Sequence, residues 1–146
     1  MTGARVIATD INEYRLKKAK EFGADAVLHG DQELNLRVDR VIVCTGAYAA
    51  VEQAFKCIDK KGIILFFAIP NRDITIPIPD FWRNELTVTT SYGAAPADLE
   101  AALALIAYRK INVKDTITQV LPLKQIQEGF RIVAEAKESL KVVLEP

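Results

Sequence analysis

Short apolar runs alternate with amphipathic segments along the first seventy residues. The runs are rich in β-branched residues, which favour strands, and the predicted strands cover residues 5–9, 26–28, 38–44 and 63–68. Near-continuous apolar strands joined by amphipathic helices are typical of a parallel sheet that is covered on both faces. The pattern therefore predicts an α/β fold with a doubly wound parallel sheet.

Two helices are predicted in this half of the chain. Asn12 can cap the first, and Gly23 ends it. The second has the clearest helical period in the sequence, with apolar residues at Ala47, Ala50, Val51, Ala54, Phe55 and Ile58. Lys60–Gly62 is predicted to turn that helix into the strand at residues 63–68. Residues 29–37 carry no strong period and are predicted to form a loop.

After Pro70 the pattern changes. Residues 71–85 alternate around Pro77 and Pro79, which predicts a long extended connection. Further strands are expected at residues 86–91, 118–121 and 140–144. Two helices lie between them; the first is expected to turn an apolar face inward, and the second carries apolar residues along one face. These faces comprise Leu99, Ala102, Leu103 and Ile106 in one helix, and Ile126, Phe130, Val133 and Ala134 in the other.

Composition narrows the functional classes. Half of the 146 residues are apolar, and 19 basic residues balance 19 acidic ones, so no charged field favours nucleic acid or a membrane surface. The longest apolar run is far shorter than the roughly 20 residues that a membrane helix requires. Two cysteines give no disulfide framework. We therefore expect neither nucleic acid nor a membrane as a partner, and a reducing, cytoplasmic location.

Asp10 is the first candidate for ligand binding. It closes a predicted strand directly before a helix, where a doubly wound sheet presents its ligand-binding edge. A carboxylate in that place can accept two hydrogen bonds from a ribose diol. The alternative is an ordinary acidic residue at a helix entry, because the helix N-terminus favours negative charge.

Thr45–Gly46 is the second candidate. A glycine between a buried strand and a helix lets a ligand approach the backbone, although a tight turn alone can also require glycine. The three-glycine dinucleotide fingerprint, GxGxxG, does not occur in the sequence.

No catalytic group or metal site is evident. His29 is the only histidine, and no second histidine or carboxylate cluster lies near it in the sequence. Cys44 and Cys57 are too far apart for a CxxC pair, so a zinc site built from this chain alone is not expected. Pattern analysis therefore predicts a ligand-binding α/β domain without catalytic or metal-ligating residues.

Six short stretches carry a further signal. They are VIATD (6–10), NEYRL (12–16), AKEFGAD (19–25), VDRVIVCTG (38–46), KG (61–62) and SLKVVLEP (139–146). In sequence and order they resemble the zinc-dependent alcohol, polyol and threonine dehydrogenases of the medium-chain dehydrogenase/reductase superfamily. The resemblance covers essentially the whole chain. It implies that residues 1–146 form a partial dinucleotide-binding domain of Rossmann type, incomplete at its N-terminus, with the C-terminal helix and strand elements that follow it.

The resemblance implies a role for ten residues in binding NAD. Asp10 would accept hydrogen bonds from the adenosine ribose, Arg15 would lie beside the adenosine, and Lys141 would lie near the pyrophosphate. Arg15 and Lys141 could equally be solvated surface residues. Thr45 and Gly46 would line the cofactor cleft. Residues Phe67, Ala68 and Ile69 would present backbone groups to the nicotinamide amide, and Ser91 and Tyr92 would lie next to that amide.

The sequence also departs from the family. The N-terminal domain that carries the catalytic zinc is absent, as are the first strand of the nucleotide-binding domain and its glycine-rich turn. Met1 could be an internal methionine or a point of truncation. Because the first strand is central in such a sheet, we expect residues 6–9 and 41–44 to pair directly or to exchange strands between chains.

The implied parent activity is hydride transfer between NAD and a secondary alcohol or polyol, with zinc required only in the full-length enzyme. We expect very weak NAD binding and no turnover from this chain alone, and a homo-oligomer. One alternative is a fragment of a zinc-independent quinone or enoyl reductase, against which Asp10 argues because those enzymes commonly use NADPH. Another is a non-enzymatic nucleotide-binding or oligomerisation module.

Overall fold

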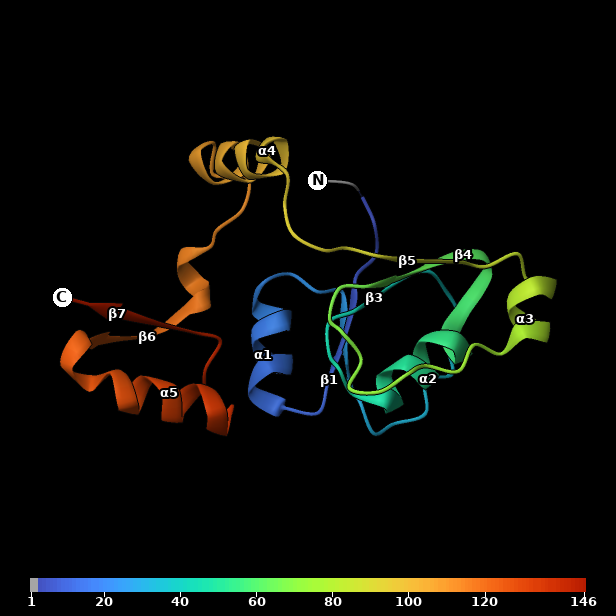
Figure 1. The fold of residues 1–146 in the computed structure, drawn as a ribbon, viewed down its shortest axis with the longest axis horizontal. Helices are drawn as coiled ribbons and strands as arrows, with labels where there is room; N and C mark the ends of the chain where they lie inside the picture. Colours follow the sequence, from blue (N-terminus) through green and yellow to red (C-terminus); the bar gives the residue numbers. More distant parts are fainter. Residues whose placement is uncertain (1–2) are drawn as a thin grey trace. The chain divides into compact units, whose positions relative to one another are not determined.

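The computed structural model describes residues 3–146. Its α-helices and strands alternate in the order β1 Ile7–Asp10, α1 Glu13–Glu21, β2 Ala26–His29, β3 Val38–Val43, α2 Tyr48–Cys57, β4 Ile58–Phe66, α3 Ile78–Arg83, β5 Thr87–Thr90, α4 Pro96–Ala107, β6 Ile117–Pro122, α5 Ile126–Glu135 and β7 Lys141–Glu145 (Figure 1). They form two compact units. One comprises the chain up to Gln32 together with Ala94–Pro146, and the other comprises Glu33–Gly93.

The Glu33–Gly93 unit is built on a three-stranded sheet in the order β3-β4-β5, and both strand pairs are parallel. Helix α2 packs on it with the apolar face that the sequence predicts, since Val51 is 1% exposed and Ala54 2%. The core also contains Val43, Ile58, Ile64, Phe66 and Leu86. The α/β class and the parallel pairing are therefore confirmed.

Strand β4 begins five residues earlier than predicted. The expected Lys60–Gly62 turn lies inside it as an irregularity, because the register with β3 shifts between Val38 and Arg40. Lys61 has a φ of 57°, and a Cβ on Gly62 would lie 2.5 Å from side-chain atoms of Ile58. The predicted turn between helix and strand is therefore wrong, because β4 pairs with β3 on both sides of residues 60–62.

The predicted extended connection at residues 71–85 is wrong in its second half, where α3 forms. Pro77 precedes the helix and Pro79 lies in its first turn, where a missing N–H costs no helical hydrogen bond. Phe81 turns toward the core of this unit. The two prolines therefore open a short helix instead of maintaining an extended chain.

In the other unit, β1, α1 and β2 form a compact β-α-β element. Strands β1 and β2 pair in parallel from Ile7 with Ala26 to Asp10 with His29. Asn12 caps α1, since its Oδ1 accepts a hydrogen bond from the Arg15 amide at 3.0 Å, and the chain leaves the helix through Gly23 at a φ of 98°. Both predicted helix boundaries are confirmed.

Strands β6 and β7 form a parallel pair on which α5 packs (Figure 1). The apolar face predicted from the sequence is largely exposed, since Phe130 is 69% exposed and Val133 56%. The helix instead approaches the strands through Gly129, where an added Cβ would lie 3.4–3.8 Å from Leu144, Val142 and Leu121. Gly129 is the buried residue of α5, and a period of apolar side chains does not reveal it.

Helix α4 forms as predicted, but its expected inner face is not covered by the described residues. Leu99 is 60% exposed, Leu103 66% and Ile106 40%, and no residue of the helix is buried. The periodicity correctly predicted a helix, but the described part of the chain supplies no surface that buries it.

The strands at residues 6–9 and 41–44 belong to separate sheets, one in each unit. Strand β1 belongs to a two-stranded sheet with β2, and β3 is the edge strand of the β3-β4-β5 sheet. The direct pairing expected from the sequence stays a prediction. Among residues 3–146, no helix is long and apolar enough to span a membrane.

Candidate functional site

In the Glu33–Gly93 unit, the carboxyl ends of β3 and β4 bring Thr45–Gly46 next to residues 67–69. The amides of Phe67 and Ala68 both donate to the Val43 carbonyl, at 3.1 and 3.0 Å. Gly46 accepts from the Asn71 amide at 3.0 Å, and a Cβ on it would lie 2.9 Å from the Ile69 carbonyl oxygen. Only glycine fits this close approach, so the two predicted segments form one local cluster.

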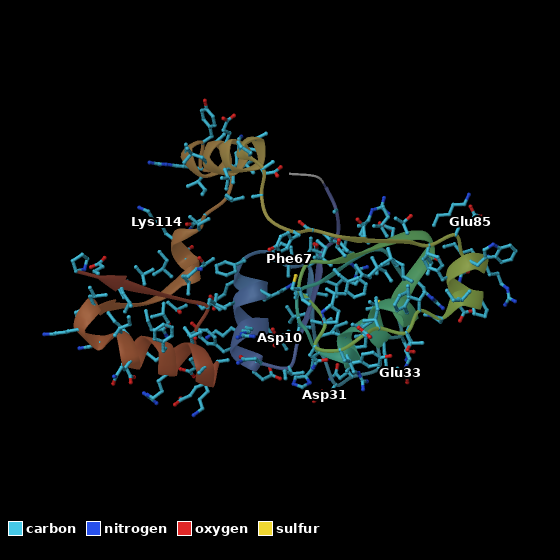
Figure 2. All side chains as sticks on the ribbon, in the orientation of Figure 1. Asp10, Asp31, Glu33, Phe67, Glu85 and Lys114 are labelled. Carbon is cyan, nitrogen blue, oxygen red and sulfur yellow. The ribbon has the colours of Figure 1, made fainter. Side chains whose placement is uncertain are left out.

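The end of β5 adds Ser91 and Tyr92 to the same edge. The Ser91 amide donates to the Phe66 carbonyl at 3.4 Å, which places Ser91 beside the segment that follows β4. The side chains offered here are mostly exposed. Tyr92 is 97% exposed, Ile69 82% and Phe67, labelled in Figure 2, 64%. All seven candidate residues of this unit therefore lie at the carboxyl ends of neighbouring parallel strands, where ligands bind in open α/β sheets.

Asp10 and Arg15 form a second cluster, in the other unit. Asp10 ends β1 beside α1 (Figure 2), and its Oδ2 lies 3.8 Å from Nη1 of Arg15. The Asp10 Oδ1 accepts from the Asn12 amide at 2.9 Å. The side chains remain accessible, with 31% of Asp10 and 42% of Arg15 exposed. The carboxylate is thus oriented by the backbone and retains capacity to accept further hydrogen bonds.

Two residues that sequence reasoning missed support these clusters. The Gly30 amide donates to the Asp10 carbonyl at 2.9 Å, and a Cβ on Gly30 would lie 3.2 Å from Ile11. Arg72 stacks 3.6 Å from the ring centroid of Tyr48, the first residue of α2. The position of Gly30 directly after a strand could have indicated its role, because a glycine there allows close backbone packing. Nothing in the local sequence indicated the Arg72 stacking, because the two side chains are brought together by the fold.

The other residues considered are Lys141 and His29, and His29 is the partner of Asp10 in the pairing of β1 with β2. Lys141 opens β7 with an exposed side chain, and its carbonyl accepts from the Thr118 hydroxyl at 3.3 Å. Within residues 3–146 it makes no hydrogen bond or ion pair with Asp10 or Arg15. The His29 ring lies 3.0 Å, through Nε2, from the Ile11 carbonyl oxygen, which gives it a structural partner.

The described residues do not fit a zinc ion. No group of three or more His, Cys, Asp and Glu side chains in residues 3–146 is placed to hold a metal. Cys44 is exposed, Cys57 is buried, and neither forms a disulfide. Burial raises the pKa of the Cys57 thiol, which disfavours the thiolate that metals bind. No chemical step can therefore be assigned to zinc from these residues.

In sequence the chain is similar to curated sorbitol and alcohol dehydrogenases. A sorbitol dehydrogenase from Halalkalibacterium halodurans is 30% identical over 99% of this chain and 46% of its own length. An alcohol dehydrogenase from Geobacillus stearothermophilus is 31% identical over 97% of this chain and 44% of its own. The chain thus spans less than half the length of these relatives.

Solved structures share the fold. An alcohol dehydrogenase from Escherichia coli in complex with NADH superposes with a TM-score of 0.88 at 18% identity, covering 97% of this chain and 44% of that one. A zinc-binding dehydrogenase from Sinorhizobium meliloti bound to NADP gives a TM-score of 0.83 at 20% identity, covering 98% and 45%. The Rossmann-type architecture inferred from the sequence is therefore confirmed.

The sequence itself matches a family model. The match spans residues 1–108, nearly three quarters of the chain, and the model is that of the zinc-binding dehydrogenases. This agrees with the resemblance seen in the sequence. The chain belongs to the zinc-binding dehydrogenase family.

Proposed function

We propose that this chain binds NAD and forms the cofactor-binding portion of an alcohol or polyol dehydrogenase. The observation that carries the proposal is the Asp10 carboxylate, which stands at the carboxyl end of a parallel strand with Arg15 at 3.8 Å. A carboxylate in that place can accept both hydroxyls of the adenosine ribose, and Arg15 can contact the adenosine. When bound, the cofactor would supply hydride chemistry.

The cluster at Thr45–Gly46 would contact the nicotinamide half. Because the Phe67 and Ala68 amides already donate to Val43, the carbonyl oxygens of residues 67–69 are the groups we expect to meet the carboxamide. Gly46 supports this role, since its lack of a Cβ lets the turn after β3 lie against the Ile69 carbonyl oxygen. Ser91 and Tyr92 would flank the same group. Lys141 remains a proposed contact for the pyrophosphate.

Asp10 also supports NAD over NADP. A 2′-phosphate would bring negative charge next to the carboxylate, whereas the unmodified diol can donate to it. Because one structural neighbour holds NADH and another NADP, the family fold accommodates both, and the preference depends on this residue. The same argument disfavours an NADPH-dependent quinone or enoyl reductase as the parent enzyme.

The experiment compares Asp10→Asn with Asp39→Asn, a matched control at an exposed carboxylate in β3. We expect wild type and the control to bind NAD more tightly than NADP in an NMR titration. Asp10→Asn should lose about tenfold in NAD affinity, since a hydrogen bond to a charged group contributes about 1.5–3 kcal/mol. Tighter binding of NADP by wild type, or equal NAD affinity in both variants, would contradict the assignment.

We further propose that the chain functions within a homo-oligomer in a reducing, cytoplasmic setting. The apolar residues on α4 support association, since Leu103 is 66% exposed, and free Cys44 and Cys57 accord with reducing conditions. Light scattering should show an oligomer that Leu103→Glu converts to a monomer, while Leu123→Glu at an exposed site elsewhere leaves it intact. A monomeric wild type would contradict this proposal. The alcohol or polyol substrate follows only from the proposed parent activity.

A further inference from the structure

Asn12 makes three side-chain hydrogen bonds that connect distant parts of one unit. Its Oδ1 accepts from the Arg15 amide at 3.0 Å, as expected of a helix cap. Its Nδ2 donates to the carbonyl oxygens of Ala136 and Lys137, at 2.6 and 2.9 Å, which are 124 and 125 residues away. Every polar group of the amide is thereby used, and the loop from β1 to α1 is joined to the turn from α5 to β7.

The same residue also orients Asp10. The Asn12 backbone amide donates to the Asp10 Oδ1 at 2.9 Å, while its side chain holds the first turn of α1, which carries Arg15. A displacement of Asn12 would therefore move the carboxylate and the guanidinium together. Neither group is fixed by burial, because both side chains remain partly exposed.

The turn that receives Asn12 is itself specialised. Ala136 ends α5 in the left-handed region, at a φ of 49°, and its amide donates to the Ile132 carbonyl. This conformation is uncommon for a residue other than glycine. It presents two successive carbonyl oxygens, at residues 136 and 137, to the Asn12 amide. Ser139 follows as a buried residue before β7 begins.

We propose that Asn12 is a positioning residue, which fixes Asp10 and Arg15 for the nucleotide by anchoring their loop to the α5–β7 turn. The inference rests on the proposed function. Asparagine suits this role because it offers one acceptor to the helix and two donors to the turn. Aspartate would retain the helix cap but would place a carboxylate oxygen against two carbonyl oxygens. The cap and the anchor can therefore be separated by a single substitution.

The Asn12 contacts should couple ligand binding at Asp10 to the stability of the α5–β7 turn. If the loop and the turn are joined, a ligand that orders Asp10 also stabilises the turn, and loosening the turn weakens the ligand. Addition of ADP-ribose should therefore slow hydrogen exchange at the amides of Ala136 and Leu140, although neither residue touches the ribose in the proposed binding mode. A residue that only caps α1 would not transmit this effect.

The test compares wild type, Asn12→Asp and a control, Asn112→Asp, by hydrogen exchange and NMR titration with ADP-ribose. The Asn112 side chain makes only local hydrogen bonds, as acceptor from the Lys114 amide and donor to the Asp115 carboxylate. In Asn12→Asp we expect faster exchange at Ala136, preserved protection at Arg15, and about a fivefold or greater loss of ADP-ribose affinity. The Asn112→Asp affinity should equal that of wild type.

The other possible outcomes distinguish a wrong positioning role from a wrong nucleotide site. If wild type binds ADP-ribose without slower exchange at Ala136 and Leu140, the positioning role is wrong even if Asn12→Asp fails to fold. Equal affinity in wild type and Asn12→Asp would likewise overturn it while leaving the NAD site standing. If wild type shows no saturable change with ADP-ribose, the proposed function fails and the positioning role fails with it.

Discussion

Helices α2 and α4 are both rich in apolar residues, yet only α2 is buried. On α2, Val51 is 1% exposed and packs against the β3-β4-β5 sheet, whereas Leu103 on α4 is 66% exposed. Both segments were predicted as helices from the spacing of apolar residues. The comparison shows that this spacing predicts the helix and its apolar positions, while burial depends on a surface that the rest of the fold must supply.

The largest expected effect is on the free energy of unfolding, when a buried and an exposed isoleucine are each replaced by alanine. Ile64 in β4 is fully buried, and Ile106 on α4 is 40% exposed. Ile64→Ala should lower the free energy of unfolding by about 2–5 kcal/mol, because it removes buried methyl groups and leaves a cavity. Ile106→Ala should change it by less than about 0.5 kcal/mol. Urea unfolding measures both, and equal losses would contradict the difference in burial.

Two glycines extend the comparison to backbone packing. Gly62→Ala should destabilise the chain by about 1–3 kcal/mol, because its Cβ would lie 2.5 Å from Ile58 and 2.7 Å from the Asp59 carbonyl oxygen. Gly129→Ala should stabilise α5 by up to about 1 kcal/mol, since the new methyl group meets Leu144 at an ordinary 3.4 Å. Thermal unfolding should therefore show a lower midpoint for Gly62→Ala and a higher one for Gly129→Ala. Stabilisation by Gly62→Ala would show that the β4 irregularity is loosely packed.

The smallest expected effect is electrostatic and lies on the exposed side of α5. Arg131 donates to Glu135 at 2.6 Å and to Glu128 at 2.8 Å, and it lowers the pKa of both carboxyls from their usual 4.5. A lowered folded-state pKa stabilises the fold above the unfolded pKa, and this contribution is lost as the pH falls through the folded value.

Arg131→Met should therefore lower the thermal midpoint slightly at pH 7 and leave it unchanged at strongly acidic pH. Because all three side chains are solvent-exposed, added salt should also diminish the difference at pH 7. A difference that persists after both carboxyls are protonated would assign the effect to packing of the arginine stem.

The sequence predicted the local elements better than their surroundings. Strand boundaries near Asp10 and the cap at Asn12 were correct, because β-branched runs and capping residues act within a few positions of the chain. The α3 helix was missed because Pro77 and Pro79 suit both an extended segment and a helix start. The face of α5 that packs on the strands was not predicted, because its buried residue, Gly129, has no side chain to mark that face.

Local sequence patterns predicted only part of the candidate site. Thr45–Gly46 and Asp10 end strands, so their location followed from the order of elements. The long-range partners did not, since the Arg72 contact with Tyr48 and the Asn12 contact with Ala136 join residues that no local pattern relates. The roles of Arg15 and Lys141 came from family resemblance, and they remain predictions.

The central claim is that Asp10 and the strand ends at Gly46 and residues 67–69 bind one class of ligand. An NMR titration of the labelled 146-residue chain with NAD tests it most directly. We predict weak binding, with a dissociation constant of about 1 mM or higher, amide shifts concentrated at residues 10–15, 45–46 and 67–69, and no alcohol oxidation. Shifts confined to other residues, or none at saturating NAD, would contradict the site. Micromolar affinity for NAD, or measurable alcohol oxidation, would contradict the expectation that these 146 residues alone bind NAD weakly and do not turn over.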